Sequence, residues 1–101
     1  MPDAKFAIYA HLKAKPGKNA EIEAFLKSAK PLAEKEPGTI TWYAFHEHAD
    51  SYGIYDTFAT EKDRQAHLDG PIAKALMAKA SELLAEAPMI HKIDVLAAKI
   101  P

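Results

Sequence analysis

The spacing of the hydrophobic residues changes several times along the chain, and this change limits the possible folds more than any other feature. Apolar residues alternate with others over residues 5 to 14, which predicts a strand. From Asn19 they recur at helical spacing until the turn EPG at 36 to 38. Two stretches rich in β-branched and aromatic residues, 39 to 47 and 52 to 58, are joined by a short polar turn. They predict a hairpin.

The second half of the chain predicts two helices and a last strand. Thr60 and Asp63 resemble a capping box that opens a short polar helix, and Gly70 ends that helix. Another helix is expected over 71 to 86, and a strand over about 89 to 99. The order β-α-β-β-α-α-β predicts an α+β protein of the ferredoxin-like, split βαβ type with a four-stranded antiparallel sheet.

The predicted strands carry apolar side chains on both faces, although helices could cover only one. In the first strand, for example, Ala7 and Tyr9 lie opposite Phe6 and Ile8. In a monomer the uncovered face would expose an apolar patch of several hundred Å², which is about the largest that monomers show. We therefore expect a homodimer in which a second subunit covers this face.

Composition excludes several classes of function. The 101 residues fit a single domain, 1 to 101, and contain no cysteine, which excludes disulfides, thiolate metal sites and a cysteine nucleophile. The 13 basic and 14 acidic residues are spread evenly, so neither nucleic acid nor an anionic membrane is an expected partner. The polar start, MPDAKFAIYA, is typical of neither a signal peptide nor a spanning segment. We expect a soluble, cytoplasmic protein.

Three segments, EPGTITWYAF, YGIYDTF and AHLDGPIAKAL, have a joint spacing that resembles the antibiotic biosynthesis monooxygenase family. This family consists of small dimeric α/β-barrel proteins and includes quinol and anthrone oxygenases, haem degraders and members of unknown reaction. The resemblance covers nearly the whole chain. It implies a dimer whose sheets meet as a barrel, with a pocket in each subunit between the sheet and the helices.

The resemblance implies a cofactor-independent monooxygenase that uses O2 without metal or flavin. Triplet O2 reacts directly only with molecules that give up one electron easily, such as phenolates and enolates. The expected substrate is thus a small phenol, quinol or polyketide-like aromatic, bound in a dry aromatic pocket with a group that handles its proton. The alternative is a non-catalytic ligand-binding or dimerisation module of the same fold.

Haem degradation is disfavoured within the same resemblance. Haem-degrading relatives carry an Asn in strand one, a Trp that closes strand three and a helical His. Here strand one has no Asn, and Phe58 takes the place of the Trp. The pair His46 and His48 is the one metal-binding candidate, but it lacks a third ligand. No metal or other cofactor is expected.

His67 and Asp56 are the predicted catalytic residues. An imidazole titrates near neutral pH and can move a proton in either direction, and Asp63, one helical turn earlier, could orient the ring. Asp56 lies in the middle of a strand, where Asp is disfavoured, so it is expected to face a polar contact or the pocket. The alternative for His67 is a hydrogen-bonded packing residue.

The residues that line the pocket depend on the register of the hairpin. If Glu47 pairs with Tyr52, then Tyr43 and Phe45 share a face with the third strand's alternate side chains, and a one-residue slip places Trp42 there instead. The short helix contributes Leu68 and Arg64, which could steady an anion or remain an exposed charge. The predicted substrate contacts are Trp42, Tyr43, Phe45, Ile54, Phe58, Arg64 and Leu68.

Overall fold

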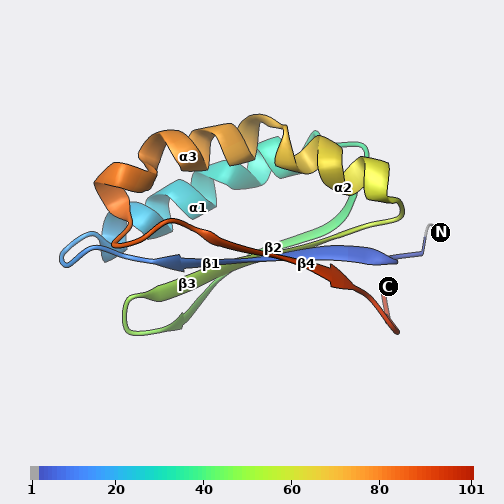
Figure 1. Cartoon of the computed structure of the whole chain (residues 1–101), viewed down its shortest axis with the longest axis horizontal. Helices are drawn as coiled ribbons and strands as arrows, with labels where there is room; N and C mark the ends of the chain where they lie inside the picture. The colour runs from blue at the N-terminus through green and yellow to red at the C-terminus, as the bar shows by residue number, and fades with distance from the viewer. Residues whose placement is uncertain (1–2) are drawn as a thin grey trace.

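The computed structural model describes residues 3 to 101 and shows three helices packed on one face of a four-stranded antiparallel sheet (Figure 1). The predicted order of elements is confirmed, and the strands lie side by side in the order β2-β3-β1-β4. The elements are β1 (Phe6–Lys13), α1 (Asn19–Glu34), β2 (Thr39–His48), β3 (Ser51–Phe58), α2 (Glu61–Leu68), α3 (Pro71–Leu83) and β4 (Met89–Asp94).

The helices begin and end where local chemistry requires it. Gly17 adopts a φ of 79° in the turn before α1, a conformation that glycine takes without steric cost. The backbone N–H of Asp63 donates to the Thr60 hydroxyl at 3.1 Å, so Thr60 caps α2 as predicted. Pro71 occupies the first turn of α3, where its missing N–H costs nothing. The buried stripe of α1 packs on the sheet and consists of Ile22, Leu26, Ala29 and Ala33.

The hairpin adopts the register that places Trp42 toward the helices. His46 pairs with Tyr52, and Trp42 pairs with Asp56, so these side chains share the helix-facing side of the sheet. Of the two registers left open by the sequence, the one that pairs Glu47 with Tyr52 does not occur, and the one shifted by a residue does, because β3 begins at Ser51. Tyr43 therefore lies on the opposite face.

The opposite face of the sheet is aromatic and carries no helix. Tyr9 stacks on Phe45 and on His91, with ring centroids 6.2 and 5.6 Å away, and Tyr43 is 58% exposed. Gly53 lies beneath the Phe45 ring, where an added Cβ would approach Phe45 Cζ to 2.5 Å. Glycine is thus required for this ring to lie flat on the sheet.

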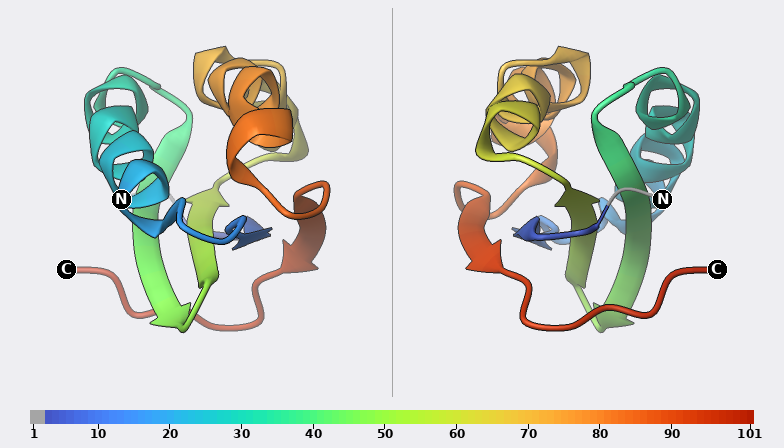
Figure 2. Two further views of the ribbon diagram at one scale, coloured as in Figure 1. Left: turned by 90° about the vertical axis from the view of Figure 1, so that its left-hand side faces the viewer. Right: turned by 90° about the vertical axis from the view of Figure 1, so that its right-hand side faces the viewer.

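The last strand is shorter than predicted and ends at Asp94. Asp94 pairs with Phe6, the first residue of β1, so the chain beyond it has no partner strand except through the hydrogen bond from Val95 N–H to Lys5 O. The segment 95 to 101 instead crosses beneath the open face toward β2 (Figure 2). Within residues 3 to 101, no helix has the length and apolarity that a membrane span needs.

Candidate functional site

His67 is held between two carboxylates that come from different elements. Its Nδ1 lies 2.7 Å from Glu36 Oε1, in the connection between α1 and β2, and its Nε2 lies 2.8 Å from Asp56 Oδ2, on β3. The Asp56 side chain is fully buried, and that of His67 is 8% exposed. The ring of Phe58 lies 5.4 Å from the imidazole. This Glu36–His67–Asp56 cluster ties α2 to both the sheet and the end of α1.

The cluster fixes the charge of His67. Burial lowers the pKa of the imidazole, but the hydrogen bonds and charges of Asp56 and Glu36 outweigh it and raise the pKa of His67 to about 9. Burial also raises the pKa of Asp56, although its hydrogen bond to His67 opposes the change. At neutral pH His67 is therefore an imidazolium that donates its Nδ1–H to Glu36 and forms an ion pair with Asp56 through Nε2.

The structure places Arg64 and Asp63, two further residues considered for the site, in contacts within the fold. Arg64 is neither exposed nor available to an anion: it is buried, donates to the backbone oxygens of Ala7 and Ile93 at 3.2 Å each, and pairs with Glu61. Asp63 does not orient His67, because its carboxylate accepts the Thr60 hydroxyl at the start of the helix. Both side chains serve the attachment or the capping of α2.

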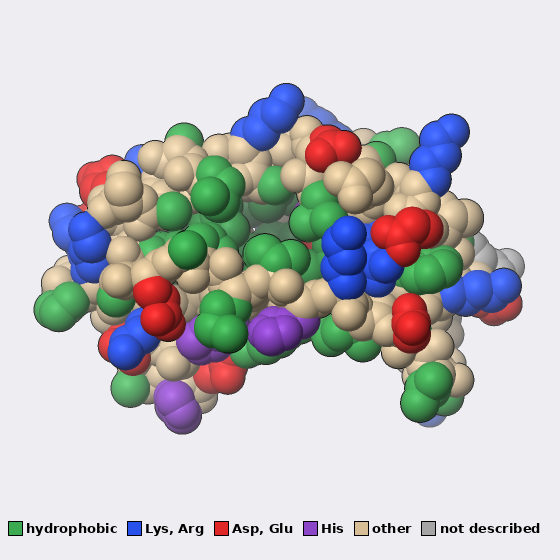
Figure 3. Space-filling model, viewed as in Figure 1, with side chains coloured by type: hydrophobic (Ala, Val, Ile, Leu, Met, Phe, Trp, Pro, Cys, Tyr) green, Lys and Arg blue, Asp and Glu red, His purple; other side chains and the backbone are tan. Residues whose placement is uncertain are grey.

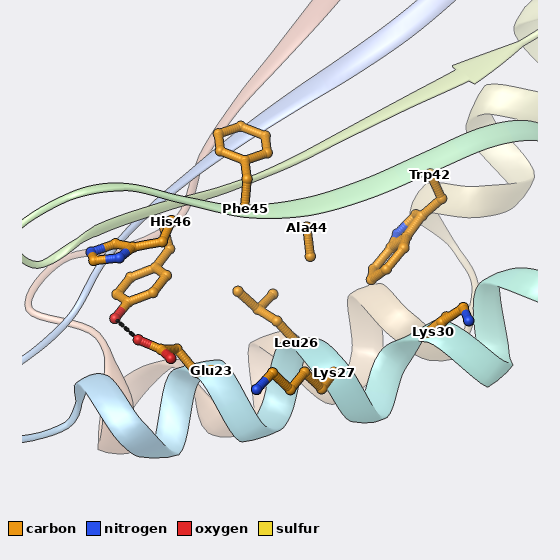
Figure 4. A pocket seen from close by; sticks show the side chains of 9 residues that line it. Glu23, Leu26, Lys27, Lys30, Trp42, Ala44, Phe45 and His46 are labelled. Atoms are coloured by element: carbon orange, nitrogen blue, oxygen red, sulfur yellow. Dashed lines mark hydrogen bonds between the residues drawn. The ribbon is translucent and has the colours of Figure 1, made fainter.

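A hollow of about 350 Å³ opens between α1 and β2 (Figure 4). We call it the α1–β2 hollow. The indole of Trp42 closes one end, and Leu26 and Ala44 form its apolar floor. The residues that line it are Glu23, Leu26, Lys27, Lys30, Trp42, Ala44, Phe45, His46 and Tyr52.

Tyr52 and Glu23 form a polar pair at the other end of this hollow. The Tyr52 hydroxyl donates to Glu23 Oε2 at 2.6 Å, and the phenol ring is almost fully buried. Burial and this hydrogen bond both raise the pKa of Tyr52, so the phenol stays neutral. The α1–β2 hollow thus combines aromatic walls with a hydroxyl, a carboxylate and the two lysines of α1.

Trp42 separates this hollow from the Glu36–His67–Asp56 cluster. A second hollow of about 380 Å³ lies on the other side of the indole, and Glu36 and Thr41 are among the residues that line it. Glu36 Oε2, Trp42 Nε1 and both carboxylate oxygens of Asp56 are buried and have no aligned hydrogen-bond partner within residues 3 to 101, so the contact of Asp56 Oδ2 with His67 is an ion pair. Neither His67 nor Asp56 lines the α1–β2 hollow.

A third apolar region lies on the side of the molecule that α3 and β4 border. Hydrophobic side chains surround a depression there (Figure 3), and Met77 on α3 and Ile90 on β4 are exposed large hydrophobic residues of these two elements. Ile90 pairs with Ala10 and so points toward the helices. The sheet is thus covered incompletely along β4.

The predicted substrate contacts divide into three groups. Trp42 lines the α1–β2 hollow, whereas Ile54, Phe58 and the half-buried Leu68 pack in or beside the core and do not line it. Tyr43 points to the open face, and the Phe45 ring turns away from the hollow that the residue borders (Figure 4). The hairpin register explains why Trp42 faces the hollow while Tyr43 and the Phe45 ring do not.

Three charged residues of the α1–β2 hollow were not among the predicted site residues. Glu23, Lys27 and Lys30 recur at helical spacing beside the buried stripe of α1, and this spacing was the available signal. Nothing in the sequence distinguishes them from ordinary solvated charges without the pairing of β2 to place Trp42 opposite.

The chain matches the family description "Antibiotic biosynthesis monooxygenase" over residues 5 to 79. Its fold is similar to that of a protein of unknown function from Nitrosomonas europaea, with a TM-score of 0.95, 49% identity, and coverage of 97% of this chain and 95% of the other. A protein from Caulobacter crescentus, provisionally assigned to the same family, has a TM-score of 0.78 at 25% identity and covers 93% and 92%.

Rv0793 from Mycobacterium tuberculosis shares the fold, with a TM-score of 0.83 at 14% identity and coverage of 94% of this chain and 98% of the other. Among curated proteins, none matches the chain. The match covers about three quarters of the sequence, and the fold agrees over nearly its full length. The chain therefore belongs to the antibiotic biosynthesis monooxygenase family.

Proposed function

We propose that the protein is a cofactor-independent monooxygenase that oxidises a small electron-rich aromatic, such as a phenol, a quinol or a polyketide-like molecule, with O2. The observation that carries the proposal is the α1–β2 hollow, in a chain that belongs to this family. Its floor and end wall are apolar, and its polar groups gather at the rim. An apolar floor with polar groups at the rim is the arrangement that holds and orients a flat ring.

The hollow supplies what direct reaction with O2 requires. The substrate hydroxyl gives its proton to the Glu23 carboxylate at the rim, and the resulting phenolate gives one electron to O2. The radical pair recombines to a peroxide, which regains the proton and loses water, so one oxygen atom stays in the product and the other leaves as water. Lys27 and Lys30 place positive charge at the rim, which attracts an anionic substrate. No step of this reaction needs a metal or a flavin.

The catalytic roles of His67 and Asp56 stay predictions. As an imidazolium, His67 has no free lone pair at neutral pH. It could move a proton only by passing one to Asp56 or Glu36, and of these two Glu36 borders the second hollow. In the proposed reaction the cluster chiefly fixes α2 to β3 and to the connection between α1 and β2.

A ligand-binding module without turnover is the second candidate. The observation that favours it is that the predicted catalytic residues His67 and Asp56 contact each other, and the predicted substrate contact Arg64 binds backbone oxygens of the sheet. All of these contacts hold α2 on the sheet. A hollow with the same walls would then bind an aromatic molecule without changing it.

Oxygen uptake distinguishes the two candidates. With hydroquinones and anthrones as substrates and a chelator present, we expect uptake well above the protein-free rate for at least one compound. An oxygen electrode measures it, and the chelator removes the contribution of trace metals. Uptake equal to the protein-free rate across the panel would favour the binding module.

We further propose that the open face of the sheet binds a second copy of this chain. Exposed Tyr43, the Tyr9–Phe45 stack and His91 form a flat aromatic surface that water would cover in a monomer. Light scattering on a size-exclusion peak at micromolar concentration is expected to give twice the 11.1 kDa mass of the chain. A mass near that of one chain would contradict the barrel arrangement.

A further inference from the structure

Charged residues follow a fixed order along the rim of the α1–β2 hollow. Glu23, Lys27 and Lys30 lie on α1 at intervals of four and three residues, so they share the side that borders the hollow (Figure 4). Within residues 3 to 101, neither of these lysines forms an ion pair. The rim is thus negative at one end and positive beyond it, with two ammonium groups available to a ligand.

The negative end of the rim can accept a hydroxyl group. Tyr52 donates to Glu23 Oε2, and the other carboxylate oxygen makes no hydrogen bond within the described residues. A carboxylate accepts several hydrogen bonds, so a ligand hydroxyl can donate to the remaining oxygen. The same charge repels an acidic group, which directs that group toward the lysines.

The length of the rim suits a molecule of about two fused rings. Residues 23 and 30 are separated along the helix axis by about 10 Å, at 1.5 Å per residue. Leu26 and Ala44 lie between the charged ends, and the Trp42 indole closes the space. A flat ring system with a hydroxyl at one end and an acid at the other matches this order of negative, apolar and positive groups.

We propose that the α1–β2 hollow selects hydroxyaromatic acids, with the acidic group paired to Lys27 and Lys30 and the hydroxyl donated to Glu23. This inference rests on the proposed function in taking the hollow as the substrate site, and it narrows the substrate class from electron-rich aromatics to anionic ones. The lysines determine specificity and orientation. They pair with a group remote from the reacting ring position.

Three probes test the charge order by equilibrium binding under nitrogen. 6-Hydroxy-2-naphthoate carries both groups at opposite ends, 2-naphthoate lacks the hydroxyl, and 2-naphthol lacks the acid. Isothermal titration calorimetry at pH 7 is expected to show 6-hydroxy-2-naphthoate binding about tenfold more tightly than 2-naphthol, since two partly exposed ion pairs contribute on that scale. This preference is expected to shrink as NaCl is raised.

Matched variants test whether the rim residues cause the preference for naphthoates over 2-naphthol. Lys27→Gln with Lys30→Gln is expected to weaken both naphthoates about tenfold and to leave 2-naphthol unchanged. The control, Lys62→Gln with Lys74→Gln, removes the same charge from exposed positions on α2 and α3 and is expected to change none of the three affinities. Glu23→Gln keeps an acceptor for Tyr52 and is expected to reduce the advantage of the hydroxyl.

Three outcomes would overturn the proposal: 2-naphthol binding as tightly as the naphthoates, equal losses in the rim variant and its control, or no binding of any probe. The result is independent of turnover. A naphthoate preference without oxygen uptake would support this inference while the oxygenase proposal fails. Uptake confined to neutral aromatics would support the oxygenase and overturn the charge selection.

Discussion

His67→Ala is expected to lower the free energy of unfolding by about 3 to 5 kcal/mol, the scale for removing one partner of a buried ion cluster. The change leaves Asp56, which is fully buried, and Glu36 without their shared cation. A melting temperature lower by about 10 °C or more should follow for a domain of this size. Circular dichroism during heating measures it.

The control for this variant is His48→Ala, which removes an exposed imidazole at the hairpin and should change the melting temperature little. A loss of only about 1 kcal/mol in His67→Ala, the scale of an ordinary partly buried side chain, would contradict the account of the cluster. Turnover per folded molecule separates catalysis from structure. A further loss of about 10²-fold there would support the predicted catalytic role of His67.

Stability is expected to fall as pH rises from 6 to 9. The folded state raises the pKa of His67 from 6.5 to about 9, so between these values the folded protein holds a proton that the unfolded chain has released. The cluster's stabilisation is therefore complete below pH 6.5 and lost as pH passes 9. A shift of this size corresponds to at most about 3 kcal/mol.

The Asp56 carboxylate that faces His67 does not reverse this trend. Burial raises the pKa of Asp56 above 3.8, and a raised carboxyl pKa also makes the folded state lose stability as pH rises. Melting temperatures across pH 6 to 9 measure the slope, and His48→Ala should retain it. A melting temperature that stays level or increases over this range would show that His67 is not held as a cation.

The sequence was sufficient to predict the fold because each element carries its own local signal. The Thr60 cap, Pro71 in the first turn of α3 and the alternation of β1 all act within a few residues, so no long-range information was needed. The end of β4 was predicted too late, because the strand stops where β1 offers no further partner. The end of β4 is therefore determined by where its partner strand begins and not by the composition of residues 95 to 99.

The site was less predictable because it depends on register and on contacts distant in sequence. A shift of one residue in the hairpin register decides whether Trp42 or Tyr43 faces the helices. Either register places apolar side chains on the helix-facing side, so the sequence pattern does not distinguish them. Glu36 lies 31 residues from His67 in the chain, so no local spacing indicated that the two side chains meet. Asp63 lies one helical turn from His67 and was the carboxylate that the spacing indicated, but it caps α2 instead. Asp56 was expected to face a polar contact or the pocket because Asp is unusual within a strand, but its pairing with His67 was not predicted.

The indole resonance of Trp42 gives the most direct test of the α1–β2 hollow as the ligand site. Trp42 is the chain's single tryptophan, so its Nε1–H gives one assignable signal in a ¹⁵N–¹H NMR spectrum. Titration with 6-hydroxy-2-naphthoate is expected to shift this signal saturably, together with the amides of Lys27 and Lys30. An unchanged Trp42 signal, with shifts confined to Met77 and Ile90 or to the open face around Tyr43, would contradict the account.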